Sequence, residues 1–251
     1  MSRADRFSSG AARYDRFRPG YPAGMLAAVA RAVADAPDAG PVVDVGAGTG
    51  IFTRQLAEAL PGVDVIGLEP SEAMRRRAGE AGGARYLDGA AEALPFADGS
   101  VRALTAAAAA HWFDRTRFYA EAKRVLPSGG ALAILDYPRD VEGSAAAAAS
   151  EAFLTRHGDG RAYERPDYAR ELMSLADFAK PVSQVTPVVT AMTEDAFVEM
   201  VLSSSHARAV EARLGVPETA RLLHSLATRL ADDEGRVLYG VRFRLFTAVR
   251  L

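Results

Sequence analysis

The segment VVDVGAGTG, residues 42–50, combines a short apolar run with three glycines at alternate positions. Glycine in an ordered chain costs conformational entropy, so Gly46, Gly48 and Gly50 indicate a sharp backbone turn or a ligand lying against the main chain. Residues 51–60 have the apolar spacing of a helix, and a helix N-terminus offers unpaired amides and a positive dipole to negative charge. The segment is therefore a candidate ligand site.

A carboxylate follows at the end of the next predicted strand. Glu69 lies 23 residues after Gly46, where it could accept two hydrogen bonds from a ribose diol. This spacing predicts a nucleoside ligand. The dinucleotide fingerprint G-x-G-x-x-G would need glycine at position 51, and Ile51 argues against a nicotinamide cofactor.

A third candidate group is AAHWFD, residues 109–114, just after another predicted strand. His111 could remove a proton from an acceptor as a general base, or it could only line the pocket. Trp112 is expected to pack. The other histidines show no spacing typical of a metal site, and the chain has no cysteine, so we predict no metal, disulfide or thiol nucleophile.

These residues need a parallel sheet to bring them together. The first part of the chain alternates predicted strands with predicted helices, which implies βαβ units with helices on both faces of a doubly wound sheet. The strands are residues 42–45, 63–68, 84–87, 101–108 and 131–137, and the helices are residues 23–36, 51–60, 72–79 and 116–126.

After residue 137 the alternation stops. The later strands are expected to pair antiparallel at the sheet edge, with the helices between them covering the carboxyl ends of the parallel strands. The later strands are residues 182–190 and 237–249, and the later helices are residues 143–157, 168–178, 194–203 and 217–230.

The composition favours a small-molecule protein. The 251 residues, 49% hydrophobic and 25% charged, fit one globular domain or a domain with a lid. The net charge of −2 provides no broad cationic field, so nucleic acid is not an expected partner. The start lacks the apolar core of a signal peptide, and no apolar run is long enough for a membrane span, so we expect a cytoplasmic protein with no membrane partner.

The loop D-V-G-A-G-T-G resembles the first motif of class I S-adenosylmethionine-dependent methyltransferases. VIGLEPSEAM (65–74) resembles their second-strand motif, and YLDGAAEALPF (86–96) their adenine-binding loop. The segments 109–114 and 121–135 resemble the regions around their fourth and fifth strands. The arm YDRFRPGYP (14–22) and the phrases EPSEAM and HWF are similar to the methyltransferase type 11 branch that includes trans-aconitate methyltransferase-like proteins.

The resemblance implies a Rossmann-like methyltransferase fold. This is an α/β fold with a doubly wound, seven-stranded, mostly parallel sheet, an antiparallel last strand and a helical cover. Residues 1–22 would form an arm over the cofactor site, 23–137 the S-adenosylmethionine-binding core, and 138–251 the helical cover with the last two strands. The arm could instead be a loosely ordered tail.

The implied function is transfer of a methyl group from S-adenosyl-L-methionine to a small-molecule acceptor, which leaves S-adenosyl-L-homocysteine. An oxygen of a carboxylate or hydroxyl is the first choice, and nitrogen or carbon stays open. The alternatives are a non-catalytic S-adenosylmethionine-binding protein and a nicotinamide-dependent oxidoreductase. The sequence does not indicate an oligomeric state.

The resemblance also assigns roles to individual positions. Asp44, Gly46 and Gly48 would hold the methionyl end of the cofactor, Glu69 its ribose, and Pro70 and Met74 its adenine ring. Many relatives have aspartate where this chain has Ala90, so a side-chain hydrogen bond to adenine is missing. The predicted cofactor-binding residues are Tyr14, Asp44, Gly46, Ala47, Gly48, Glu69, Pro70, Met74, Gly89, Ala90, Ala91, Glu92 and Ala109. The predicted substrate-pocket residues are Arg18, Tyr21, Trp112 and Tyr137, and the predicted catalytic residue is His111.

Overall fold

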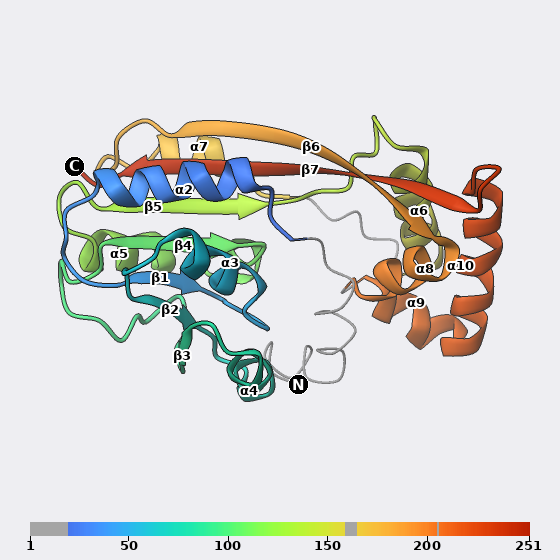
Figure 1. Ribbon diagram of the computed structural model, residues 1–251, viewed down its shortest axis with the longest axis horizontal. Helices are drawn as coiled ribbons and strands as arrows, with labels where there is room; N and C mark the ends of the chain where they lie inside the picture. The colour runs from blue at the N-terminus through green and yellow to red at the C-terminus, as the bar shows by residue number, and fades with distance from the viewer. Residues whose placement is uncertain (1–19, 159–164, 205) are drawn as a thin grey trace.

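A seven-stranded sheet forms the centre of the computed structural model, which describes residues 20–158, 165–204 and 206–251 (Figure 1). The strand order is β3-β2-β1-β4-β5-β7-β6. β1 to β5 are parallel, and β7 is antiparallel to both of its neighbours. The predicted doubly wound sheet with an antiparallel last strand is confirmed. The strands are β1 (Val42–Val45), β2 (Val65–Leu68), β3 (Arg85–Leu87), β4 (Ala103–Ala107), β5 (Ala131–Asp136), β6 (Val182–Thr193) and β7 (Arg236–Val249).

The central strands are buried on both faces of the sheet. All four residues of β1 are buried, and successive side chains point to opposite faces of the sheet. Val42 belongs to the core on one face and Val43 to the core on the other. The first face packs against α2 (Ala23–Asp35) and α3 (Ile51–Ala59), and the second against α5 (Arg115–Val125) and α7 (Tyr168–Met173). α4 (Glu72–Ala81) lies beside β3 (Figure 1).

β6 and β7 extend beyond the rest of the sheet as a two-stranded ribbon. The pairing of β5 with β7 ends at Arg244, whereas the pairing of β6 with β7 continues to Arg236. The ribbon carries a group of helices at its far end, on the side of the carboxyl ends of the parallel strands (Figure 1). We call this group the helical cap: α6 (Ala145–His157), α8 (Glu194–Leu202), α9 (Ala207–Leu214) and α10 (Val216–Leu230).

Some element boundaries differ from the predictions. The helix expected over 168–178 ends at Met173, because the next residues pair with the end of the chain: Phe178 forms a bridge with Arg250, and the Leu251 N–H donates to the Asp177 carbonyl. The sequence analysis missed α9 and the short 3₁₀ helix η2 (Ala110–Trp112).

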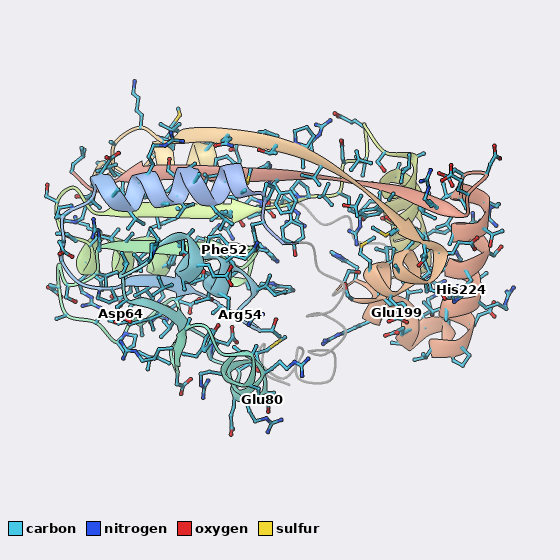
Figure 2. All side chains as sticks on the ribbon, in the orientation of Figure 1. Phe52, Arg54, Asp64, Glu80, Glu199 and His224 are labelled. Carbon is cyan, nitrogen blue, oxygen red and sulfur yellow. The ribbon has the colours of Figure 1, made fainter. Side chains whose placement is uncertain are left out.

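The helices show the expected division between inner and outer side chains. Phe52 of α3 is buried, while Glu80 of α4 is exposed (Figure 2). Within the described residues, no helix has the length and apolar character that crossing a membrane requires.

Candidate functional site

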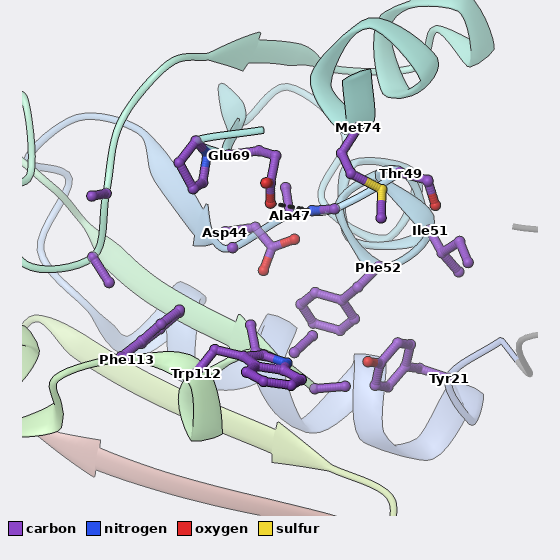
Figure 3. Close-up of a pocket in the computed structure, with 18 of the residues that line it drawn as sticks. Tyr21, Asp44, Ala47, Thr49, Ile51, Phe52, Glu69, Met74, Trp112 and Phe113 are labelled. Carbon is purple, nitrogen blue, oxygen red and sulfur yellow. Dashed lines mark hydrogen bonds between the residues drawn. The ribbon is translucent and has the colours of Figure 1, made fainter. Parts of the chain in front are cut away.

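A cavity of about 290 Å³ lies where the parallel strands end at their carboxyl edge (Figure 3). Its walls come from the loops that follow β1, β2, β3, β4 and β5, together with the start of α3 and the segment before α2. Parallel strands place these loops at one edge of the sheet, so residues far apart in the sequence share one cavity. The lining residues are Tyr21, Asp44, Gly46, Ala47, Gly48, Thr49, Ile51, Phe52, Glu69, Pro70, Met74, Ala90, Ala91, Glu92, Ala107, Ala108, Ala109, Trp112, Phe113 and Tyr137.

The three glycines of the loop after β1 have different tasks. All three have positive φ, at 74° for Gly46, 58° for Gly48 and 80° for Gly50. A Cβ on Gly46 would lie 2.7 Å from the Cβ of Ala109, and one on Gly50 would collide with the Tyr86 hydroxyl. A Cβ on Gly48, which lines the cavity, would meet no described atom within 4 Å. Gly46 and Gly50 are therefore needed for packing, while Gly48 leaves backbone open to a ligand.

Glu69 joins the loop after β1 to the loop after β2. Its carboxylate accepts hydrogen bonds from the backbone N–H groups of Gly48 and Ser71, each at 2.9 Å. The side chain is 8% exposed, and burial raises its pKa while these two hydrogen bonds act in the opposite direction. A carboxylate has about four acceptor positions, so Glu69 can still accept hydrogen bonds from two neighbouring ligand hydroxyls.

Asp44 is buried at the end of β1 beneath the glycine loop. It accepts hydrogen bonds from the hydroxyls of Thr53, at 2.6 Å, and Thr105, at 3.0 Å. Burial raises its pKa to about 7, although the two hydroxyls favour the charged form. Thr49 also lines the cavity, and its buried hydroxyl has no hydrogen-bond partner among the described residues.

Pro70, Met74, Ala90 and Ala91 form a largely apolar wall next to Glu69. This wall suits a flat, weakly polar ring. Glu92 at its end accepts a hydrogen bond of 2.7 Å from the Asp114 N–H, which connects the loops after β3 and β4.

Aromatic side chains form the opposite wall of the cavity (Figure 3). The Tyr21 ring lies 4.8 Å from that of Phe52 and 5.8 Å from that of Tyr137, in edge-to-face contacts. Trp112 also lines the cavity, and the neighbouring ring of His111 lies 4.9 Å from it. Beside them, Ala108 has a φ of 51°, a strained value for a residue with a Cβ.

Most of the predicted site residues share this one cavity. His111 and Gly89 are not among its lining residues, and Tyr14 and Arg18 lie outside the described residues. A Cβ on Gly89 would lie 2.7 Å from Leu68, so glycine there is required for packing. The predicted residues that line the cavity are Tyr21, Asp44, Gly46, Ala47, Gly48, Glu69, Pro70, Met74, Ala90, Ala91, Glu92, Ala109, Trp112 and Tyr137.

The sequence analysis missed several lining residues. Thr49 lies between two of the recognised glycines, and Ile51 and Phe52 follow them at the start of α3, so these positions were a signal that could have identified all three residues. Phe113 belongs to the candidate segment 109–114, whereas Ala107 and Ala108 carry no comparable signal, because alanine is also an ordinary core residue.

Comparisons with known proteins agree with this geometry. Residues 43–134 match the methyltransferase domain family. An uncharacterized methyltransferase of Mycobacterium tuberculosis is 31% identical over 241 residues, which cover 92% of this chain and 90% of that protein. A Dictyostelium discoideum protein, provisionally assigned as a methyltransferase, is 36% identical over 133 residues, and the matched part covers 49% of that protein. A solved structure from Anaeromyxobacter dehalogenans, provisionally assigned as a type II methyltransferase, has a TM-score of 0.70 at 26% identity and covers 93% of this chain and 98% of its own.

The strand order and the cavity at the carboxyl edge of the sheet, taken together with these relatives, identify a class I S-adenosylmethionine-dependent methyltransferase. The chain belongs to the methyltransferase family, and not to the nicotinamide oxidoreductases considered from the sequence. Its residues fit the cofactor that this family uses. Gly48 leaves the backbone open, and Glu69 retains acceptor positions for ribose hydroxyls.

Proposed function

We propose that the protein transfers a methyl group from S-adenosyl-L-methionine to an oxygen atom of a small-molecule acceptor and releases S-adenosyl-L-homocysteine. The observation that carries this proposal is the cavity in which the open backbone at Gly48 lies against the buried Glu69 carboxylate. Relatives named demethylmenaquinone methyltransferase and malonyl-[acyl-carrier protein] O-methyltransferase support an acceptor that is neither nucleic acid nor a protein side chain.

The lining residues have separate tasks in this proposal. Glu69 accepts hydrogen bonds from the ribose, and Pro70 and Met74 enclose the adenine ring. The glycine loop with Asp44 below it holds the methionyl end. When bound, S-adenosylmethionine supplies a methyl group that is already activated. The protein therefore needs to align the acceptor with that methyl group and to exclude water from the cavity. When the acceptor atom carries a proton, a base must also remove it.

His111 remains the proposed proton acceptor. It lies in η2 directly before Trp112, and its ring contacts the Trp112 ring at 4.9 Å. Replacement of His111 by Ala should lower turnover and leave the affinity for S-adenosylhomocysteine nearly unchanged. If turnover is also unchanged, His111 has no part in the reaction.

We also propose that the chain works as three parts: the arm 1–22, the core 23–137 and the cover 138–251. The arm and the cover would close the cavity over bound ligands. Deletion of residues 1–19 should then weaken S-adenosylhomocysteine binding, as measured by calorimetry. An unchanged affinity would contradict the assignment of the arm to the cofactor site.

The proposed activity is tested in two stages. Calorimetry should detect binding of S-adenosylmethionine and S-adenosylhomocysteine to the folded protein. Incubation of the protein with S-adenosylmethionine labelled in its methyl group and a pool of metabolites should then yield a labelled small molecule. Binding without any transfer would favour the alternative of a non-catalytic S-adenosylmethionine-binding protein.

A further inference from the structure

The main cavity has two chemically different sides. The side formed by Asp44, the glycine loop and Glu69 offers backbone groups and carboxylates. The other side, which we call the aromatic wall, consists of Tyr21, Phe52, Trp112 and Tyr137. The proposed function assigns the first side to the methyl donor, so the aromatic wall is left to contact the acceptor.

The aromatic wall is held in place by packing. Tyr21, Phe52 and Tyr137 are 7%, 3% and 8% exposed. Behind them, Phe243 of β7 lies 5.6 Å from the Tyr21 ring and 5.2 Å from the Tyr137 ring. The rings come from four different parts of the chain, so the sheet and helices fix their relative positions. A rigid aromatic surface favours an aromatic ligand, since such rings attract each other beyond the effect of buried area alone.

The charge of the cavity disfavours an anionic acceptor. Its ionisable carboxyl groups are those of Asp44, Glu69 and Glu92, and none of the lining residues that the structure describes is Lys, Arg or His. An acceptor carboxylate would lose its water without gaining a cationic partner in this lining, and it would lie near other carboxylates. An uncharged acceptor avoids this cost.

We propose that the acceptor is an uncharged aromatic ring that carries a hydroxyl group, bound with the ring against the aromatic wall. This inference rests on the proposed function and narrows its acceptor from carboxylate or hydroxyl to an aromatic hydroxyl. In the transfer, the hydroxyl oxygen forms a bond to the methyl carbon while the carbon–sulfur bond breaks. The electron pair of that bond stays on sulfur, and the hydroxyl proton passes to a base or to water.

The test measures binding and does not depend on turnover. Calorimetry on protein saturated with S-adenosylhomocysteine compares three probes of similar size: 4-propylphenol, 4-propylbenzoate and 4-propylcyclohexanol. The phenol should bind at least about tenfold more tightly than the benzoate, because a buried carboxylate without a cation is costly. It should also bind several-fold more tightly than the cyclohexanol, because of the aromatic contacts. Equal or tighter binding of the benzoate, or no binding of the phenol, would overturn the inference.

Variants connect the binding to the aromatic wall. Tyr137→Leu should weaken phenol binding by about fivefold or more, while the control Phe153→Leu in α6 of the helical cap should leave it unchanged. Trp112→Arg places a cation in the wall, so it should reverse the preference and make the benzoate the tighter ligand. If Trp112→Arg still binds the phenol more tightly than the benzoate, the charge of this wall does not select the acceptor, and that part of the inference is wrong.

The same experiment separates the two proposals. If S-adenosylhomocysteine binds but the phenol does not, the inference about the acceptor falls and the proposed methyl transfer stands. If S-adenosylhomocysteine does not bind to the folded protein, both fall. The chain contains a single tryptophan, so quenching of Trp112 fluorescence gives a second measure of ligand entry into this cavity.

Discussion

Replacing Gly46 by alanine should destabilise the fold more than replacing Gly48, although both glycines line the cavity. Both glycines have positive φ, so each substitution carries a backbone cost of roughly 1–2 kcal/mol. At Gly46 the new Cβ would also lie 2.7 Å from Ala109 and 3.1 Å from the Phe113 ring. Such overpacking adds about 1–3 kcal/mol. At Gly48 the Cβ meets nothing described within 4 Å and projects where a ligand would lie.

The free energy of unfolding should therefore fall by roughly 2–5 kcal/mol in Gly46→Ala and by only about 1–2 kcal/mol in Gly48→Ala. Gly62→Ala is the matched control, because Gly62 has a φ of 83°, nothing within 4 Å and an exposed position on the turn before β2. It should lose about as much stability as Gly48→Ala. Urea unfolding followed by the fluorescence of Trp112 measures all three variants.

Affinity for S-adenosylhomocysteine should distinguish Gly48→Ala from its control Gly62→Ala. Gly48→Ala adds a methyl group where the ligand contacts the backbone, which should weaken binding by roughly 5- to 100-fold. Gly62→Ala should bind as the wild type does. The reasoning is refuted if Gly48→Ala destabilises the fold as strongly as Gly46→Ala, or if calorimetry finds its affinity unchanged.

Three further predictions concern groups around the cavity. Glu69→Ala should weaken S-adenosylhomocysteine binding by at least about a hundredfold, since hydrogen bonds to a charged group contribute roughly 1.5–3 kcal/mol each; a loss below threefold in calorimetry would exclude the ribose contact. Burial raises the pKa of Asp44 from 3.8 to about 7, so the folded chain holds this proton more tightly than the unfolded chain does. The resulting stabilisation is fully present at low pH and is lost as the pH rises from about 4 to about 7. Relative to Asp44→Asn, the wild type should therefore lose as much as about 4 kcal/mol of unfolding free energy between about pH 4 and pH 8, and parallel pH profiles in urea unfolding would contradict this. Ala108→Gly should raise the midpoint of thermal unfolding and increase the free energy of unfolding by up to about 1 kcal/mol, since glycine adopts the φ of 51° without strain. A lower midpoint would show that the alanine methyl is needed for packing.

The order of strands and helices in the first half of the chain was predictable because its signals are local. Val42–Val45 is an apolar run followed by glycines, and Ile51–Ala59 has helical spacing, so strand, turn and helix are all marked within twenty residues. Glu69 was predictable for the same reason, since its distance from the glycine loop follows from the length of one helix and one strand.

Long-range packing accounts for the features that the sequence analysis missed. The helix starting at Tyr168 stops early because Phe178 pairs with Arg250. A Cβ at position 89 would press against the Leu68 side chain, which comes from another strand of the sheet. No pattern around these residues indicates such partners.

The sheet class, the glycine loop and the acidic residue that follows it are all predictable from the amino-acid sequence. Each depends on hydrophobic periodicity and backbone preference within a short segment. The aromatic wall formed by Tyr21, Phe52, Trp112 and Tyr137 is visible only in the folded chain, as is the lack of Lys, Arg and His among the described residues that line the cavity. These properties arise where distant segments meet, and contacts between distant segments are set by how the whole chain packs.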